Sequence, residues 1–127
     1  MTVLDASVLI AHLEPADRRH ERATRLLLAH QADEFAASVI SLAEIYVGAA
    51  RANRVADVER AIARLRVAAV PLPATAARRL AEIRTTTNLK MPDCCVIHAA
   101  EQHHATVATF DSVLADQARR LNLSTTD

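Results

Sequence analysis

The sequence predicts an α/β fold, a three-layer α/β/α sandwich built around a mainly parallel sheet. Short β-branched and apolar segments alternate along the chain with longer segments whose apolar residues recur at helical spacing. This alternation is typical of parallel sheets, because a helix must carry the chain back between neighbouring strands. A chain of 127 residues with 51% hydrophobic residues and no internal repeat or linker has the size of one domain. We therefore expect a single domain over residues 1–127.

The predicted strands are short, apolar and rich in β-branched or small residues. They are Thr2–Leu4, Phe35–Ser38, Val67–Leu72 and Thr106–Thr109. Pro73 ends the third of them, because proline cannot donate a hydrogen bond to a neighbouring strand.

The predicted helices occupy the segments between the strands. They are Ala6–Leu13, Ala16–Gln31, Val39–Asn53, Arg54–Arg66, Ala74–Thr86, a helix from about Pro92 to His103, and Ser112–Leu121. The segment over 39–53 is apolar around most of its circumference, so we expect neighbouring elements to cover it on most sides. In the helix over 74–86 we expect Ala77, Leu80, Ala81 and Ile83 to be buried.

Composition excludes several classes of protein. Fifteen basic and fifteen acidic residues give a net charge of zero, unlike a strongly basic nucleic-acid-binding domain. With Gly48 as the single glycine, the chain cannot form the glycine-rich loops that bind the phosphates of nucleotides. Its apolar runs are shorter than the roughly 20 residues that a membrane-spanning helix needs, and Met1 leads directly into the first strand without a leader-like segment. We expect a cytoplasmic protein, with the adjacent Cys94 and Cys95 reduced.

Four acidic residues lie in apolar surroundings rather than in polar ones: Asp5, Glu44, Asp93 and Asp111. An aspartate between a strand and a helix can be a helix cap, and this interpretation stays open for Asp5, Asp93 and Asp111. It does not apply to Glu44, which lies within a helix and has no basic residue three or four positions away. Carboxylates with few basic neighbours bind hard cations such as Mg²⁺ or Mn²⁺, which can activate water against a phosphodiester. Nuclease activity is the hypothesis that follows.

With these four acids in this order, the chain resembles PIN-domain proteins, and among them the VapC toxins of bacterial toxin–antitoxin pairs. The resemblance spans nearly the whole chain. The segments that carry it are Val3-Leu4-Asp5-Ala6-Ser7, Ser41-Leu42-Ala43-Glu44-Ile45, Met91-Pro92-Asp93 and Ala108-Thr109-Phe110-Asp111. The resemblance implies that Asp5, Glu44, Asp93 and Asp111 bind Mg²⁺, or Mn²⁺, and hydrolyse RNA endonucleolytically. It also implies that the hydroxyls of Ser7 and Thr109 help to order the site.

One departure from the family pattern concerns the residues that follow Asp111. Many relatives place a further acid there, whereas this chain has Ser112 and Val113. Asp116 is the nearest substitute, and its position along the predicted helix favours a solvated surface role.

The resemblance also implies partners. The family precedent is a homodimer bound by a small VapB-like antitoxin, whose tail can lie over the acidic site and insert an arginine or lysine. From the residues themselves, a surplus apolar stripe on the helix over 54–66 predicts that the helices over 39–66 form the dimer interface. The stripe consists of Val55, Val58, Ile62 and Leu65.

Other interpretations remain open at the level of sequence. The chain is alternatively a catalytically inactive PIN-fold interaction protein, or an aspartyl phosphotransferase with Asp5 as nucleophile, although such enzymes usually carry a second acid where Ser7 stands. Cys94, Cys95 and His98 have spacings that could bind zinc, but buried thiols and an ordinary histidine explain them more simply.

Arginines are candidates for contacts to RNA phosphates. One group lies at 18, 19, 22 and 25, and a second comprises Arg51, Arg54 and Arg84 with Lys90. Solvated helix faces account for them equally well. Because Phe35, Tyr46 and Phe110 are the only aromatic residues, we expect RNA recognition to rest on shape and backbone rather than on base stacking.

Overall fold

The computed structural model describes residues 1–127 and contains one five-stranded sheet in which all strands are parallel. The strand order is β3-β2-β1-β4-β5. The strands are β1 (Thr2–Leu4), β2 (Phe35–Ser38), β3 (Ala68–Val70), β4 (Thr106–Ala108) and β5 (Thr125–Thr126). The expected α/β fold with a mainly parallel sheet is confirmed.

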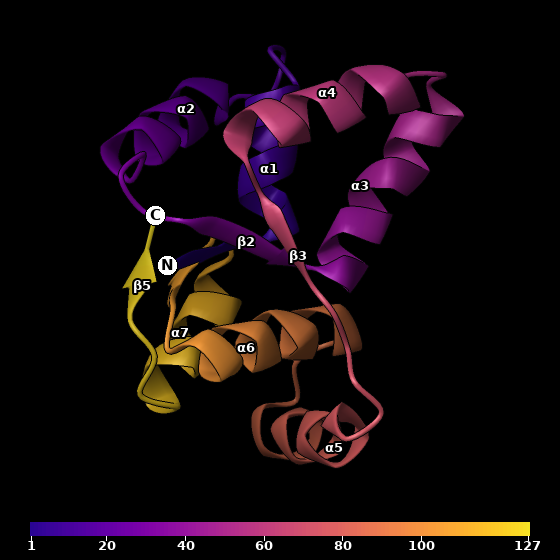
Figure 1. Ribbon diagram of the computed structural model, residues 1–127. Helices are drawn as coiled ribbons and strands as arrows, with labels where there is room; N and C mark the ends of the chain where they lie inside the picture. Colours follow the sequence, from indigo (N-terminus) through magenta and orange to yellow (C-terminus); the bar gives the residue numbers. More distant parts are fainter.

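Seven helices cover the two faces of the sheet, which makes the molecule the expected three-layer sandwich (Figure 1). One layer contains α1 (Ala6–Leu13), α2 (His20–Ala29), α3 (Val39–Arg51) and α4 (Val55–Leu65). The other contains α5 (Ala76–Thr87), α6 (Met91–His103) and α7 (Ser112–Arg120).

Alternating residues of the strands divide the core into two halves. Leu4 and Ala37 pack with α1 to α4 in one cluster, whereas Val3 and Ala36 pack with α5 to α7 in the other. This alternation follows from the two-residue period of a strand, which directs successive side chains to opposite faces of the sheet. Short strands that are buried on both faces are typical of α/β proteins.

Some predicted boundaries were wrong for local reasons. Helix α2 begins at His20 rather than at Ala16, because Asp17 closes a turn in which its side chain accepts a hydrogen bond from the backbone nitrogen of Arg19 and its carbonyl accepts one from that of His20. Strand β3 ends at Val70, before Pro71. Strand β5 was not predicted, because Thr125 and Thr126 lie in a polar tail without an apolar run.

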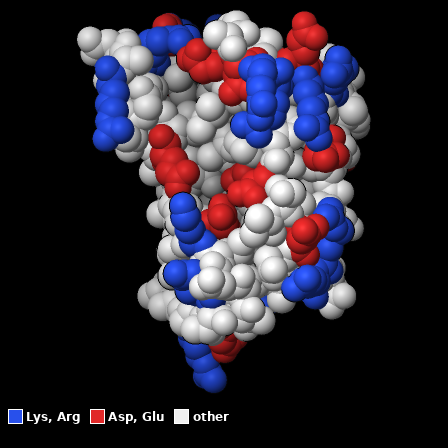
Figure 2. Space-filling view, turned by 180° about the vertical axis from the view of Figure 1, so that it is seen from behind, with Lys and Arg blue, Asp and Glu red and all other residues white.

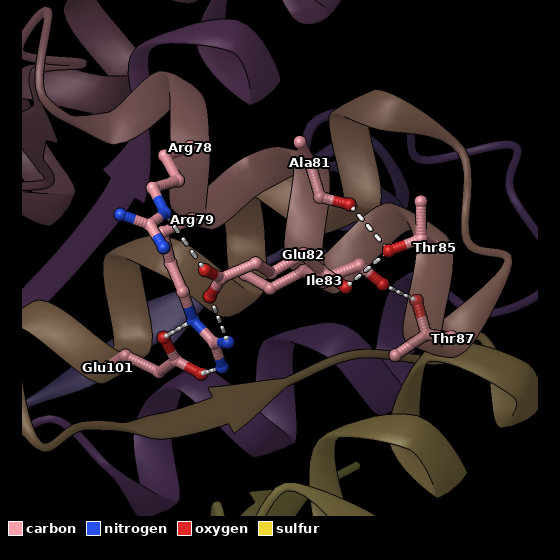
Figure 3. Close-up of polar contacts among 8 residues, drawn as sticks. All are labelled: Arg78, Arg79, Ala81, Glu82, Ile83, Thr85, Thr87 and Glu101. Atoms are coloured by element: carbon pink, nitrogen blue, oxygen red, sulfur yellow. Dashed lines mark hydrogen bonds and ion pairs between the residues drawn. The ribbon is translucent and has the colours of Figure 1, made fainter.

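The buried face of α5 differs from the prediction. Ala76, Ile83 and Thr87 are buried, whereas Ala77 and Ala81 are exposed. Figure 3 shows the ion pair between α5 and α6. The guanidinium of Arg79 on α5 donates two hydrogen bonds to the carboxylate of Glu101 on α6, at 2.9 and 2.6 Å. The burial of Ile83 in the core sets the rotation of α5, and the ion pair is compatible with it.

Two expectations about α3 and α4 were also wrong. Helix α3 is covered on one side only, and Val47 is 49% exposed on its open side. On α4, Val58 and Ile62 are buried in the core, at 9% and 7% exposure, so the stripe is not surplus surface. The number of apolar residues in α3 and α4 did not indicate which of the two helices has a solvent-exposed apolar face.

No helix in the structure is both long enough and apolar enough to span a membrane.

Candidate active site

Asp5 lies where β1 ends and α1 begins, and it is 7% exposed. Its side chain makes no cap to α1; instead its Oδ2 accepts hydrogen bonds from Ser7 Oγ at 2.7 Å and from Thr109 Oγ1 at 2.8 Å. Capping therefore does not explain Asp5. The two hydroxyls, which come from segments about a hundred residues apart, hold one carboxylate oxygen in a fixed position.

A short network continues from these hydroxyls to the segment after β4. Ser7 Oγ accepts a hydrogen bond from the backbone nitrogen of Phe110 at 3.1 Å, and Thr109 Oγ1 accepts one from that of Asp111 at 3.0 Å. The ends of β1 and β4, which are neighbouring parallel strands, are thus tied together. The carboxyl ends of neighbouring strands are the usual place for a ligand site in an open α/β sheet.

Asp111 is the N-cap of α7, and its Oδ1 accepts hydrogen bonds from the backbone nitrogens of Val113 and Leu114 at 2.9 and 3.2 Å. For this residue the capping interpretation is correct. The cap uses Oδ1 alone, so it also fixes the carboxylate at the end of β4.

Asp93 is not a cap, because the N-cap of α6 is Lys90 and Asp93 lies in the first helical turn. Its side chain is partly buried. Burial raises the pKa of Asp93 to about 6, with further contributions from the negative charges of Asp5, Asp111 and Glu44 that Lys90 partly offsets.

Glu44 points outward from α3 and is exposed. Partial desolvation raises the pKa of its carboxyl group, and the charge of Asp5 adds to the effect. The negative charges of Asp5, Asp111 and Glu44 act on Asp93, and that of Asp5 acts on Glu44, so these acids from four separate segments influence one another electrostatically. We call them the acidic centre.

Figure 2 shows acidic side chains in a hollow at the middle of one face of the molecule, with arginine and lysine side chains around it. A cluster of carboxylates that is not neutralised by basic partners is chemically suited to an oxygen-preferring divalent cation. No three His, Cys, Asp or Glu side chains converge closely enough in the structure to form a metal-binding group. By type and charge the carboxylates suit a hard divalent cation, although as they stand they do not form a closed ligand set.

The other residues considered from the sequence have surroundings typical of core or surface residues rather than of a binding site. Cys94 and Cys95 are buried free thiols whose pKa values are raised by desolvation, and His98 is buried beside them in α6. They form no metal-binding group. Asp116 forms an exposed ion pair with Arg119, in keeping with a surface role.

Phe110 lies next to the site, and the sequence predicted no role for it there. Its ring lies under the guanidinium groups of Arg19 and Arg22, 5.4 and 4.7 Å from the ring centroid. Its position between Thr109 and Asp111 was the only available signal.

Comparison with known proteins shows the family. The family model of the PIN domain matches residues 2–120, so the chain belongs to the PIN-domain family. A search of curated proteins found no match.

Solved structures with the same fold include proteins of toxin–antitoxin pairs. A chain in the structure of FitAB bound to an IR36 DNA fragment superposes with a TM-score of 0.77 at 24% identity, covering 99% of this chain and 94% of that one. VapC20 of Mycobacterium tuberculosis, described as a toxin that cleaves the sarcin-ricin loop, gives 0.76 at 18% identity, covering 91% and 94%. VapBC2 of Rickettsia felis, bound to a promoter DNA fragment, gives 0.74 at 17% identity, covering 98% and 96%.

Proposed function

We propose that the chain, as a single PIN-like domain, is an endoribonuclease that depends on Mg²⁺ or Mn²⁺ and acts as the toxin of a VapBC-type pair in the cytoplasm. The observation that carries the proposal is the carboxylate of Asp5, which Ser7 and Thr109 hold at the carboxyl ends of β1 and β4 in the same hydrogen-bond network as the backbone of Asp111. Membership of the PIN-domain family and the likeness to toxin structures support it.

In this proposal the acidic centre holds the cation, which would supply an activated water and stabilise the charge that develops on the phosphodiester. Asp5 would be the fixed ligand, since Ser7 and Thr109 hold its Oδ2 in place. Asp111 would present the oxygen that its cap does not use. Asp93 and Glu44 would complete the set, since the charge of Asp5 acts on both of them and neither is the N-cap of its helix.

The phosphotransferase alternative is not supported by the surroundings of Asp5. A nucleophilic carboxylate must reach an incoming phosphoryl group. The oxygen Oδ2 of Asp5 is held by two hydroxyls, and one of them belongs to Ser7, which stands where such enzymes usually carry a second acid.

Incubation of the purified protein with mixed cellular RNA tests the proposal. We expect cleavage in Mg²⁺ or Mn²⁺, none in EDTA, and almost none by Asp5→Asn. Metal-independent cleavage, or equal cleavage by Asp5→Asn, would contradict it. A parent protein that folds but cleaves no RNA in either metal would favour the inactive interaction protein.

The proposal includes a VapB-like antitoxin, and a groove between α1, α3 and α4 offers a place for its tail. The groove has a volume of about 530 Å³; apolar side chains such as Ile10 and Ile45 line it, Glu44 lies along it, and Arg54 and Arg60 are among its charged residues. A segment lying in the groove would lead to the acidic centre, where a basic residue would be attracted by the carboxylates.

Gly48 supports this use of the groove. Glycine within a helix costs roughly 0.5–1 kcal/mol relative to alanine, yet an added Cβ at Gly48 would meet nothing within 4 Å. Nothing within the chain therefore explains the glycine. Because Gly48 lines the groove, close approach of a partner's backbone is a sufficient reason for it.

The proposal also includes a homodimer through the helices over 39–66, in which α3 rather than the buried residues Val58 and Ile62 of α4 supplies the exposed apolar surface. Val39 and Val47 of α3 are 40% and 49% exposed. We expect sedimentation to show a dimer of the parent and a folded monomer when both residues are replaced by glutamate.

A further inference from the structure

Two arginines lie at the N-terminal end of helix α2, where positive charge is electrostatically unfavourable. Arg19 is its N-cap and Arg22 lies in its first turn beside Glu21, while Arg25 lies in the middle of the helix and the last turn has no basic residue. The N-terminus of a helix bears partial positive charge, so cations there destabilise the helix and anions are attracted. The arrangement does not serve the stability of α2, which suggests a role in binding an anion.

The side chains of Arg19 and Arg22, which we call the arginine pair, both lie against the ring of Phe110. The quadrupole of an aromatic ring attracts cations, so the ring of Phe110 holds two like charges against it. Phe110 is itself anchored, because its backbone nitrogen donates to Ser7 Oγ, which in turn donates to Asp5. The arginine pair thus lies against a residue whose backbone belongs to the hydrogen-bond network of Asp5, Ser7 and Thr109.

The hydrogen-bond donors of the pair are largely uncommitted. Arg19 makes only a long ion pair, with 3.9 Å between its Nε and the carboxylate of Asp17; that Nε is buried, but the side chain as a whole is 36% exposed. Arg22 pairs with Asp127 at 2.8 Å, but that carboxylate is 70% exposed. An exposed ion pair contributes little net free energy, so another anion can displace Asp127 from Arg22.

We propose that Arg19 and Arg22, positioned by Phe110, form a subsite that binds a backbone phosphate of the RNA strand next to the scissile bond. The inference rests on the proposed ribonuclease function. The acidic centre repels the polyanionic substrate, and the cation it holds acts only locally. A pair of planar guanidinium groups against Phe110 supplies the bidentate donors that suit a phosphate and offsets the repulsion.

The test uses fluorescence anisotropy of a labelled single-stranded RNA of mixed sequence, in EDTA, over a range of salt concentrations. Each phosphate contact on a single strand adds roughly 0.7 to the slope of log affinity against log salt, equivalent to about fivefold in affinity at 0.1 M salt. We therefore expect Arg19→Ala and Arg22→Ala each to weaken binding about fivefold and to lower the slope. Arg22→Lys should retain most of the slope, because it keeps the charge.

Two further variants separate binding from a structural role. Phe110→Leu should weaken binding without lowering the slope, because it removes the platform and no charge. Asp127→Asn should tighten binding by up to about fivefold, the effect of removing an exposed competing ion pair. Loss of a merely structural contact would not increase affinity. Arg78→Ala is the matched control, since that side chain is 92% exposed on α5 and should change only the general charge.

Equal affinity and slope for the parent, Arg19→Ala and Arg22→Ala would overturn the subsite, as would an absence of RNA binding by the parent at low salt. Circular dichroism must show that the variants are folded. A different result would contradict the proposed catalytic function and not the subsite: the parent binds RNA with the expected salt dependence but does not cleave it in Mg²⁺ or Mn²⁺. In that case the subsite would stand as a feature of an RNA-binding protein.

Discussion

Replacing Asp93 with asparagine should stabilise the protein when no metal is bound. The pKa of Asp93 rises from 3.8 to about 6 on folding, chiefly because of burial and then because of the charges of the other acids. This rise in the pKa of Asp93 corresponds to about 3 kcal/mol of unfavourable free energy for the charged form of its carboxyl group. Solvent screening and the loss of a favourable charge in the first turn of α6 reduce the expected gain to roughly 1–3 kcal/mol.

The sign of the pH dependence follows from the direction of the shift. Between pH 3.8 and about 6 the folded state holds the proton of Asp93 more tightly than the unfolded chain does. The parent therefore loses stability as the pH rises through this window, whereas Asp93→Asn does not. The difference between the two should be close to zero near pH 4 and complete at pH 7.

Thermal unfolding in EDTA at pH 4, 5, 6 and 7 measures this difference. At pH 7 we expect the melting temperature of the variant to exceed that of the parent by roughly 3–10 °C. Asp116→Asn is the matched control, because Asp116 is exposed and paired with Arg119, and it should show no such gain. The reasoning is refuted if Asp93→Asn is no more stable than the parent at pH 7, or if its gain is the same at pH 4.

Saturating Mg²⁺ should reverse the order of the two proteins. A ligand that binds only the native state adds RT ln(1 + [L]/Kd), about 4.1 kcal/mol at a thousand times Kd, which exceeds the gain expected for the variant in EDTA. The parent should receive this stabilisation, and Asp93→Asn should receive less of it. Equal stabilisation of the parent, Asp93→Asn and Asp93→Ala by metal would show that Asp93 is not a ligand.

Four further outcomes are expected. Val58→Glu combined with Ile62→Lys should unfold the chain rather than give monomers, because both side chains are buried in the core and buried charges cost several kcal/mol; a folded circular dichroism spectrum would contradict this. Gly48→Ala should raise the free energy of unfolding by roughly 0.5–1 kcal/mol while weakening antitoxin binding in calorimetry, and unchanged binding would argue against the groove. Thr109→Val should lower cleavage by roughly 10–100-fold with little change in RNA affinity, since it removes a hydrogen bond that orients a proposed metal ligand; full activity would remove that role. Burial, followed by the charge of His20, lowers the pKa of His12, so the parent should lose stability as the pH falls below 6.5, and His12→Gln should lose less in the same thermal scans.

The sequence predicted the layers of the fold because the two periodicities are clear in it. Val3 and Leu4 face opposite halves of the core, as alternation requires, and the helices follow their apolar spacing. The spacing was less informative where a helix has apolar residues on more than one side. In α3 and α4, only the tertiary arrangement decides that Val58 is core and that Val47 is surface.

The sequence predicted the residues of the acidic centre because an acid within an apolar segment is unusual. Acids in apolar segments stood out, and in the structure the charges of Asp5, Glu44 and Asp111 act on Asp93. The sequence could not decide between capping and free carboxylates, because that depends on hydrogen-bond geometry: Asp111 caps a helix, whereas Asp5 does not. Nor could it show that Phe110 contacts arginines some ninety positions away.

The most direct test of the central claim is a double-variant analysis of RNA cleavage in Mn²⁺. The rates of the parent, Asp5→Asn, Asp93→Asn and the combined variant are measured on one labelled RNA. If the acidic centre acts as one metal-holding unit, each single change removes most of the activity and the double change removes little more, because residues that act together have non-additive effects. Independent effects that multiply in the double variant, or substantial activity of either single variant, would contradict the account.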